Sequence, residues 1–295
     1  MEKINKDELM NKTICVILII LIVLSAVYIF KVYASKREAQ KERDLLNSVN
    51  VEEKADVTNE NMDSITREAE ETKSNENNEE SGKKEDSEKA EKTREENREK
   101  SFDRIEKVKK LNEEYKNIIG WVEIENTNIS YPVVQGEDNN FYLTHDYKGD
   151  KAERGAIFLD SNYNWKIKVN NYMLYGHYMI NGEMFTDLLK YIEEDFYKEH
   201  QTIRFTTMEE DAEYSIIAVF RSKVYNKSDE DVFRYYNFMN SENEKEYNKF
   251  IENAKEASLY DIEATAEYGD QLITMSTCSY YVEDGRFVIV GKKSL

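Results

Sequence analysis

Residues 271–290 read QLITMSTCSYYVEDGRFVIV, and they contain two strand-like runs separated by a polar turn. Gln271 to Thr277 and Phe287 to Val290 are rich in the apolar and β-branched residues that strands favour. The turn between them lies around Glu283-Asp284-Gly285. This pattern predicts a β-hairpin, which brings the end of one strand and the start of the next to the same edge of a sheet.

Six further runs upstream of this hairpin have the same strand-like composition. They lie at 121–124, 129–134, 155–159, 172–175, 203–206 and 214–219. Many short strands without regular helical crossovers favour a mainly β barrel or sandwich over a doubly wound α/β fold.

Helices are predicted where apolar residues recur at helical spacing. One begins near Phe102 and continues to Ile118, and Gly120 is expected to stop it. A second amphipathic helix is expected between Phe185 and Phe196. A third is expected to open at Ser241-Glu242-Asn243-Glu244, which has the pattern of a capping box.

The overall composition argues against a nucleic-acid-binding protein. The chain has 295 residues, of which 34% are charged, and its formal net charge is -19. Nucleic-acid binding requires a basic surface, and no large basic patch is found along the chain. Apolar residues are unevenly distributed, which divides the chain into three zones: residues 1–35, 36–100 and 101–295.

The first zone is predicted to be an N-terminal tail and a membrane anchor. The segment 14–30 reads ICVILIILIVLSAVYIF and carries no charge. With its flanking residues it approaches the roughly 20 residues that a helix needs to cross a bilayer. A cleaved signal peptide is the alternative, although its apolar region should be shorter and end at a small-x-small site. Lysines and arginines are more numerous after the span than before it, so the positive-inside rule does not support an external C-terminal domain.

The second zone, residues 36–100, is predicted to be a charged stalk. Its 21 acidic residues outnumber its 14 basic ones, and it contains no aromatic residue. Such a segment cannot bury enough apolar surface to offset chain entropy, so we expect it to be disordered or loosely helical. A coiled coil is the alternative, but no apolar heptad persists. Its expected role is to hold the third zone away from the membrane.

The third zone, residues 101–295, contains the residues that could perform chemistry. Cys278 lies where an apolar strand ends, and a reactive thiolate needs a basic or cationic neighbour. Arg286 begins the next strand and could stabilise an oxyanion. His177 directly follows the predicted strand 172–175. A lone cysteine is also often a small buried residue, and an arginine after a turn can simply pair with Glu283 or Asp284.

Other sites and cofactors receive little support from the sequence. His145 in a polar loop and His200 at a helix end are expected to be structural. One cysteine and three scattered histidines in the third zone give no metal-ligand pair at short spacing. No glycine-rich phosphate loop occurs, so no nucleotide cofactor is indicated. We therefore expect no cofactor.

Three stretches of the third zone resemble the sortase family, and class B sortases in particular. Leu174-Tyr175-Gly176-His177 resembles the strand end that carries the family's histidine. Thr274-Met275-Ser276-Thr277-Cys278 resembles the T-L-x-T-C signature, with Met275 in place of the usual Leu. Gly285-Arg286-Phe287 resembles the segment of the family's arginine. The stretch 129–136 (ISYPVVQG) and the helix-bearing insert at about 231–262 also look like class B features.

The resemblance implies an eight-stranded sortase-type β barrel with an N-terminal helical portion and inserted helices, preceded by a transmembrane helix. The acidic stalk is longer than the family leads us to expect. It implies a cysteine transpeptidase that cleaves a C-terminal sorting motif of secreted proteins. Cys278 would form a thioester, His177 would be general acid and base, and Arg286 would stabilise the oxyanion. An amine of peptidoglycan or its lipid-linked precursor would resolve the thioester. The barrel would lie on the extracellular face of a cell membrane, as in Gram-positive surface protein anchoring.

Two alternatives to a transpeptidase are kept open. A cysteine hydrolase or protease of the same site geometry would release its product to water. A non-enzymatic surface protein on a stalk would not need Cys278 at all. If only a small fraction of the enzyme carries the thiolate–imidazolium pair at neutral pH, as the family implies, turnover should be slow.

Overall fold

The computed structural model describes residues 81–165, 167, 169–278 and 282–294, together with scattered helical positions between 17 and 29. The predicted membrane span is described only at those scattered positions, and most of the predicted stalk lies outside the described residues. Within the described part of the chain, no helix combines the length and the apolar character that crossing a membrane requires. All elements named below belong to the unit formed by residues 52–295.

Eight strands form a closed barrel in the order β1-β2-β3-β4-β7-β8-β6-β5. The prediction of a mainly β, eight-stranded barrel is therefore confirmed. The strands are β1 (Ile118–Glu123), β2 (Ser130–Gln135), β3 (Ile157–Leu159), β4 (Asn171–Tyr175), β5 (Thr202–Thr207), β6 (Asp211–Lys223), β7 (Leu272–Cys278) and β8 (Gly285–Lys293). Most neighbours are antiparallel, but β2 pairs with β3, and β4 with β7, in parallel.

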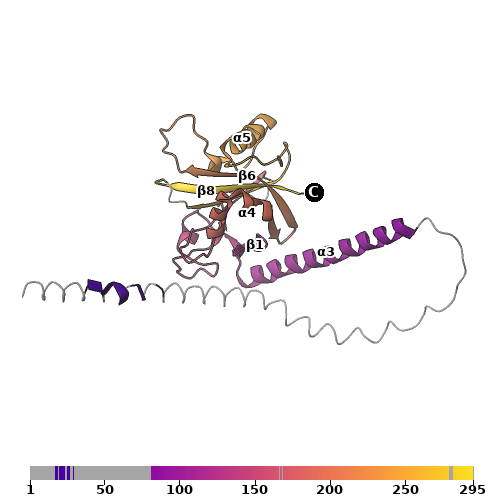
Figure 1. The fold of residues 1–295 in the computed structure, drawn as a ribbon, viewed down its shortest axis with the longest axis horizontal. Helices are drawn as coiled ribbons and strands as arrows, with labels where there is room; N and C mark the ends of the chain where they lie inside the picture. Colours follow the sequence, from indigo (N-terminus) through magenta and orange to yellow (C-terminus); the bar gives the residue numbers. More distant parts are fainter. Residues whose placement is uncertain are drawn as a thin grey trace, which may run out of the picture. The chain divides into compact units, whose positions relative to one another are not determined.

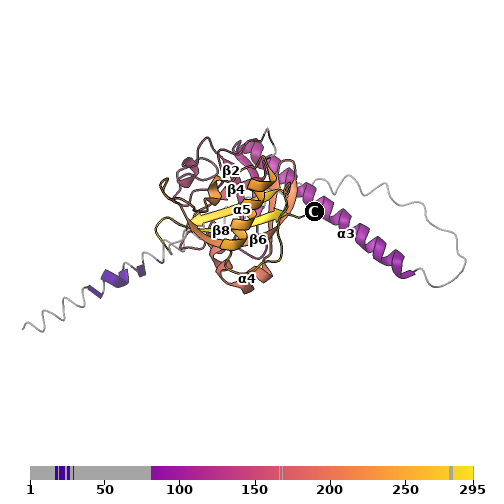
Figure 2. The ribbon, with the colours of Figure 1, turned by 90° about the horizontal axis from the view of Figure 1, so that it is seen from above.

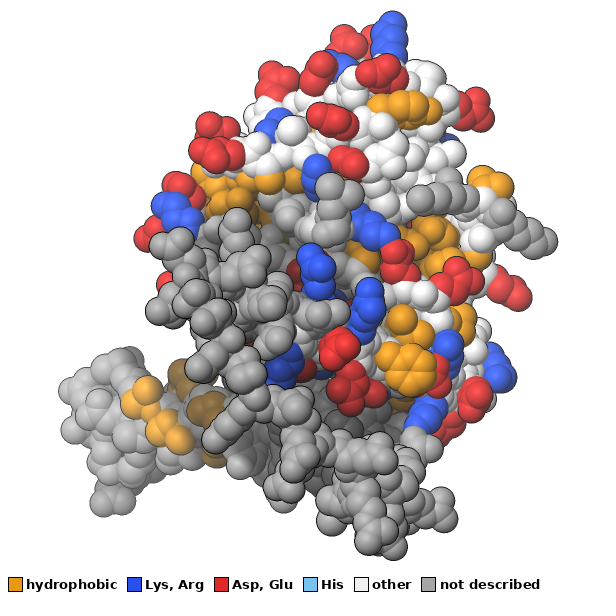
Figure 3. Space-filling model, turned by 90° about the vertical axis from the view of Figure 1, so that its right-hand side faces the viewer, with side chains coloured by type: hydrophobic (Ala, Val, Ile, Leu, Met, Phe, Trp, Pro, Cys, Tyr) orange, Lys and Arg blue, Asp and Glu red, His pale blue; other side chains and the backbone are white. Residues whose placement is uncertain are grey.

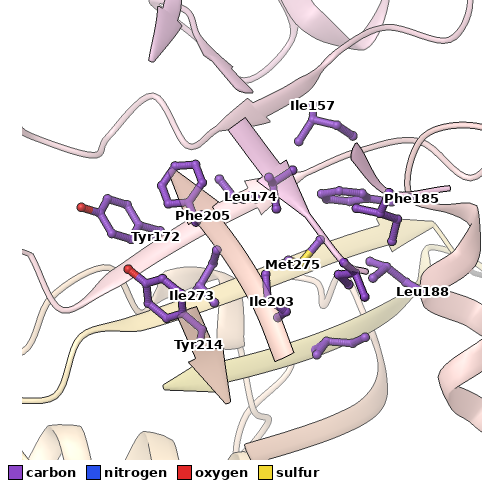
Figure 4. Packing of buried hydrophobic residues seen from close by; sticks show 14 of the residues in the cluster. Ile157, Tyr172, Leu174, Phe185, Leu188, Ile203, Phe205, Tyr214, Ile273 and Met275 are labelled. Carbon is purple, nitrogen blue, oxygen red and sulfur yellow. The ribbon is translucent and has the colours of Figure 1, made fainter. Parts of the chain in front are cut away.

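The barrel interior is filled by alternate side chains of the strands, since successive residues of a strand face opposite sides. Leu174 of β4 and Ile273 and Met275 of β7 point into this core together with Phe205 of β5 (Figure 4). These four side chains are at most 1% exposed. The interior is thus a packed core rather than a cavity.

The outer face of part of the barrel is covered by an inserted segment between β6 and β7. It contains the short 3-10 helix η3 (Tyr235–Asn237) and the helix α5 (Glu244–Ala257). Figures 1 and 2 both show α5 lying over β6 and β8. Phe250 of α5 stacks on Phe238, and both pack against the outer side chains of the barrel. This second layer makes β7 buried on both faces, which explains its nearly continuous apolar and small sequence.

The helix that precedes the barrel is longer than predicted at its N-terminus and shorter at its C-terminus. Helix α3 spans Ser81–Glu114 and leads into β1 (Figure 1). It therefore begins inside the predicted stalk. The prediction that Gly120 stops this helix is wrong, because Gly120 lies within β1, paired with Thr207 of β5. A Cβ at Gly120 would lie 2.7 Å from the Phe205 ring, so the glycine serves close strand packing.

Polar contacts attach α3 to the barrel. Arg104 of α3 and Arg204 of β5 both bond Asp211 at the start of β6, over 3.3 and 3.0 Å. Lys107 lies 3.8 Å from the centre of the Trp121 ring, and burial lowers the pKa of this amine to about 8. Such cation–π contacts favour a fixed helix position. Elsewhere, acidic and basic side chains alternate over the face shown in Figure 3, with hydrophobic patches between them.

Two further helix predictions need correction. The stripe between Phe185 and Phe196 forms a 3-10 helix, η2 (Thr186–Ile192), followed by a short α4 (Glu194–Glu199), rather than one α-helix. The third helix exists as α5, but its N-cap is Asn243, whose side chain accepts a hydrogen bond from the Glu246 N–H. Ser241 instead donates to the Asn243 carbonyl. The predicted capping box is therefore shifted.

The tight packing at Gly120 predicts the effect of adding a methyl group there. We expect Gly120→Ala to lower the free energy of unfolding by about 1–3 kcal/mol, because overpacking forces the Phe205 ring and the β5 backbone to move. Urea titration of the full chain measures this change. Gly136→Ala is the control, since its nearest contact would be 3.2 Å and a smaller loss is expected. Equal losses for both variants would contradict the assigned role of Gly120.

Candidate active site

The ends of β4 and β7 bring His177 next to Cys278. The two strands pair in parallel register, with Tyr175 opposite Ser276. The pairing extends one step further, because the Gly176 N–H donates to the Ser276 carbonyl over 3.2 Å. Continuing this register by two residues places His177 opposite Cys278. The histidine and cysteine predicted from separate strand ends are therefore neighbours.

The hairpin of β7 and β8 places Arg286 beside the same cysteine. Cys278 and Arg286 are directly paired in the antiparallel register. The guanidinium Nη1 donates to the carbonyl oxygens of Asp284 and Gly285, over 3.2 and 2.9 Å. Among the described residues it forms hydrogen bonds with backbone carbonyls rather than with the carboxylates of Glu283 or Asp284. These contacts fix the arginine, and no carboxylate in the described part of the chain forms an ion pair with it.

A backbone carbonyl sets the orientation of the His177 ring. Its Nε2 lies 2.7 Å from the carbonyl oxygen of Leu143, which follows the loop after β2. A carbonyl oxygen only accepts hydrogen bonds, so Nε2 carries a proton and Nδ1 is the ring nitrogen left for another partner. The His177 imidazole and the Cys278 thiol are close enough for hydrogen bonding between them to be the largest influence on the pKa of each. In the neutral pair, the imidazole is therefore held as a base toward the thiol.

The contacts within this group favour the charged thiolate–imidazolium pair. The hydrogen bond to Cys278, and secondly that to Leu143, raise the pKa of His177, although burial opposes them. The hydrogen bond from His177 lowers the pKa of Cys278, and the nearby Arg286 charge lowers it further, again against burial. Both shifts act in the direction that makes the sulfur more nucleophilic.

The three side chains line one open pocket of about 550 Å³. On β7 the lining contains Thr277 as well as Ser276 and Cys278. The last two are two positions apart, so they share one face of the strand. It is the outer face, because Ser276 bonds the Tyr235 hydroxyl of the inserted segment. The full lining is Asn139, Asn140, Leu143, Phe158, Asp160, Asn162, Tyr175, Gly176, His177, Val224, Tyr235, Tyr236, Ser276, Thr277, Cys278 and Arg286.

Several of these residues were not predicted from the sequence. Asp160 follows β3 just as His177 follows β4, so its position at a strand end was a usable signal. Tyr175 was seen only as a strand residue, yet its hydroxyl donates to Asp160 over 3.0 Å. Leu143 acts through its carbonyl, which no sequence pattern reveals.

The other two histidines lie outside the pocket lining. His145 stacks on Phe141 and its Nδ1 lies 2.9 Å from the Phe141 carbonyl oxygen. His200 caps α4 and stacks on Phe196. Both have local structural partners, in line with the expectation from the sequence. No group of three or more His, Cys, Asp or Glu side chains suited to a metal ion occurs in the part of the chain that is described.

The backbone of Leu143 lies close to a glycine from another segment. Leu143 ends the 3-10 helix η1 (Phe141–Leu143). Gly155 has a φ of +60°, and a Cβ there would lie 2.3 Å from the Tyr142 carbonyl oxygen and 3.1 Å from that of Leu143. The next residue, Ala156, donates its N–H to the Tyr142 carbonyl. Only glycine allows this approach of the two backbones.

The origin of the Cys278 pKa shift predicts an order of effects. The midpoint for alkylation of Cys278 by iodoacetamide should lie below that of an ordinary thiol, because only the thiolate reacts. His177→Ala should raise this midpoint more than Arg286→Ala, since the histidine hydrogen bond is the larger cause. Mass spectrometry of the Cys278 peptide across pH measures it, with His200→Ala as control. A midpoint that stays unchanged in His177→Ala would contradict this account.

The Gly155 contact predicts a second effect on the same thiol. Gly155→Ala should push the Leu143 carbonyl away from His177 and reduce the alkylation rate of Cys278 at neutral pH. Gly149→Ala is a matched control, because Gly149 also has a positive φ but nothing lies within 4 Å of its Cβ position. Both variants should lose about 1–2 kcal/mol of stability from the left-handed backbone. Equal thiol reactivity in the two variants would show that Leu143 is not displaced.

Comparison with known proteins identifies the family of this site. The family model of the sortase domain matches residues 122–294. Sortase B of Listeria monocytogenes is 34% identical over 192 residues, which cover 64% of this chain and 74% of that protein.

Solved structures agree with this match. The crystal structure of Bacillus anthracis sortase B in complex with AAEK1 has a TM-score of 0.56 and 32% identity, covering 63% of this chain and 83% of the other. A Staphylococcus aureus sortase B–substrate complex has a TM-score of 0.56 and 27% identity, covering 64% and 84%. The eight-stranded barrel, the family match and these relatives agree, so the chain belongs to the sortase family of cysteine transpeptidases, in class B.

Proposed function

We propose that this enzyme cleaves a sorting motif near the C-terminus of secreted proteins and joins the new carboxyl end to an amine of peptidoglycan or its lipid-linked precursor. The observation that carries the proposal is the convergence of Cys278, His177 and Arg286 in one pocket. The residues come from three strand ends of the barrel. Their chemistry suits acyl transfer through a thioester.

In the first half of the reaction, Cys278 attacks the carbonyl carbon of the scissile peptide bond. The oxygen gains negative charge, and the Arg286 guanidinium beside Cys278 stabilises it. The imidazolium of His177 gives a proton to the leaving nitrogen, and the C–N bond breaks. The acyl group then remains on sulfur as a thioester, and His177 is left neutral.

In the second half, the neutral imidazole takes a proton from the incoming amine, which attacks the thioester carbon. The C–S bond breaks and Cys278 leaves as a thiolate beside the regenerated imidazolium. The ion-pair form favoured by the pKa directions of Cys278 and His177 is therefore the form that starts each cycle. The same two residues serve both halves with balanced protons.

The substrate class is supported by the relatives and by the shape of the site. The Staphylococcus aureus sortase B structure is a substrate complex. In this chain the pocket is open and lies between the loop that carries Leu143 and the inserted segment that carries Tyr235. An extended peptide fits such a groove better than a small metabolite does.

We place the enzyme at the cell membrane with its barrel on the extracellular face. The apolar segment 14–30 would be the anchor, residues 36–100 the stalk and residues 101–295 the catalytic domain. The uncharged run 14–30 supports the anchor, and the absence of aromatic residues from 36–100 supports the stalk. Membership of the sortase family supports the extracellular placement of the barrel. Because α3 begins at Ser81, the last part of the stalk would be a helical spacer of about 30 Å before the barrel.

A trapping experiment tests the proposed reaction. The full chain, solubilised in detergent, is incubated with a panel of sorting-motif peptides, and the acyl-enzyme is detected by mass spectrometry. Cys278→Ala should form none. His177→Ala and Arg286→Ala should reduce the rate of acylation by at least about 10²-fold, because a proton donor or an oxyanion partner is lost. His200→Ala should behave as the wild type does.

Adding an amine acceptor separates the transpeptidase from its alternatives. Transfer to the amine, with less hydrolysis as its concentration rises, is the expected result. Hydrolysis that is unaffected by amine would favour a cysteine hydrolase. A biological function retained by Cys278→Ala would favour a non-enzymatic surface protein.

A further inference from the structure

Asp160 is a buried anion in the wall of the active-site pocket, and neither half of the reaction uses it. Asp160 directly follows β3 and is only 4% exposed. Among the described residues Asp160 forms no ion pair. Other carboxylates of the barrel do pair with a lysine or an arginine, as Asp211 does with Arg204 and Asp270 with Lys292. A buried charge needs other compensation to be stable.

Four neutral donors supply that compensation. The Oδ1 atom accepts from the backbone N–H and the side-chain amide of Asn162, both over 2.9 Å. The Oδ2 atom accepts from the side-chain amide of Asn139 and from the Tyr175 hydroxyl, both over 3.0 Å. An ionised carboxylate accepts about four hydrogen bonds, so its capacity is filled. Asp160 therefore has little left for a substrate group, which argues against a ligand-binding role.

The two donors on Oδ2 come from the two segments that must meet at His177. Asn139 lies two residues before η1, whose last residue, Leu143, offers its carbonyl to the histidine. Tyr175 ends β4, two residues before His177. One oxygen atom thus joins the segment that supplies the acceptor to the segment that supplies the imidazole.

Further hydrogen bonds make this junction stiff. The side-chain oxygen of Asn139 accepts from the Ser161 N–H over 2.8 Å, so both ends of this amide bind the segment that begins at Asp160. The side-chain amide of Gln135 donates to the Asp160 carbonyl over 3.0 Å. The Asp160 N–H continues the pairing of β3 with β4 by donating to the Met173 carbonyl. The carboxylate is therefore fixed to the barrel itself.

We propose that Asp160 is a positioning residue, which sets the contact between the Leu143 carbonyl and His177 by holding Asn139 and Tyr175 on one oxygen. The inference rests on the proposed role of His177 as general acid and base. In this proposal Asp160 touches no reacting atom, because its four hydrogen bonds go to Asn139, Asn162 and Tyr175. Its effect reaches the imidazole through the geometry of η1 and the end of β4.

The proposal has a definite consequence for proton affinity at the site. The titratable side chain that interacts with His177 is Cys278, and the charges of Arg286 and Asp284 act on that thiol. The Leu143 bond raises the pKa of His177, so its loss should lower that pKa. A ring that is no longer held should also bond the thiol less well, which raises the pKa of Cys278. The pH range in which the ion pair exists should therefore narrow from both sides.

The Asp160→Asn variant of the full chain tests the positioning role. It keeps the size of the side chain but replaces the carboxylate by an amide, which is a weaker acceptor for Asn139 and Tyr175 and carries a donor of its own. The Cys278 alkylation midpoint should move up in pH, and acylation by a sorting peptide should fall by about tenfold or more. Nitrogen-15 NMR of labelled histidine should show His177 losing its preference for a proton on Nε2. Asn139→Ala and Tyr175→Phe, which each remove one donor to Oδ2, should shift the midpoint in the same direction by less.

Asn162→Ala is the matched comparison, since it removes a donor from Oδ1 and is connected to neither η1 nor β4. It should lower the melting temperature without shifting the alkylation midpoint or the histidine tautomer. An Asp160→Asn variant with slower acylation but an unshifted midpoint and tautomer would overturn the inference. Equal shifts in Asn162→Ala would overturn it as well.

Two outcomes separate this inference from the proposed function. If Asp160→Asn does not fold, Asn139→Ala and Tyr175→Phe test the inference instead. Unshifted alkylation midpoints of Cys278 in both variants would overturn it. A wild-type chain that forms no acyl-enzyme with any peptide would overturn the proposed function. The alkylation and NMR readouts need no substrate, and they would still decide whether Asp160 positions His177.

Discussion

The parallel pairing of β4 with β7 is the constraint on which the site depends. These strands are separated by about a hundred residues of sequence, and their register alone decides which side chain faces Cys278. The register is fixed at one end by a buried hydrogen bond of 3.0 Å from the Thr274 hydroxyl to the Asn171 side chain. It is fixed at the other end by the bond from Gly176 to Ser276. A slip of one residue would turn every β7 side chain to the opposite face.

The inserted segment between β6 and β7 stabilises this register of β4 and β7. Asn171 also donates to the Phe238 carbonyl of the insert, and Ser276 bonds the Tyr235 hydroxyl. The polar residues on the outer face of β7 therefore have partners only in the observed register, and leaving them unpaired would be costly. The cover ends just before Cys278, where β7 changes from buried to partly exposed. Cys278 is thus the first residue of its strand that is partly exposed.

Most of the strands and the three reacting residues could be predicted from the sequence, because their signals lie within short stretches of chain. All eight strands carry their own apolar and β-branched signal, and His177, Cys278 and Arg286 each lie at a strand end. The errors arose where distant contacts override a local pattern. Gly120 follows an amphipathic stretch and has the position of a helix stop, yet pairing with β5 draws it into a strand. Ser241 fits a capping box, but its hydroxyl bonds the Asn243 carbonyl and leaves Asn243 to cap the helix.

The parts of the site that were missed act through groups that a sequence pattern does not describe. Leu143 contributes a backbone carbonyl, and its position depends on Gly155 from a separate loop. Asp160 looks like an ordinary polar residue after a strand until Asn139, Asn162 and Tyr175 are brought to it by the fold.

Leu143 and Asp160 matter because burial and hydrogen bonding have opposite effects on the protonation of Cys278 and His177. Burial alone would keep Cys278 and His177 neutral, and the mutual hydrogen bond opposes burial in both. Two groups that depend on each other in this way titrate as a pair. Their state is therefore sensitive to small changes in ring orientation. A site of this kind needs rigid support behind the imidazole, and we infer that in this barrel the support comes from the Leu143 carbonyl and from the buried Asp160 carboxylate.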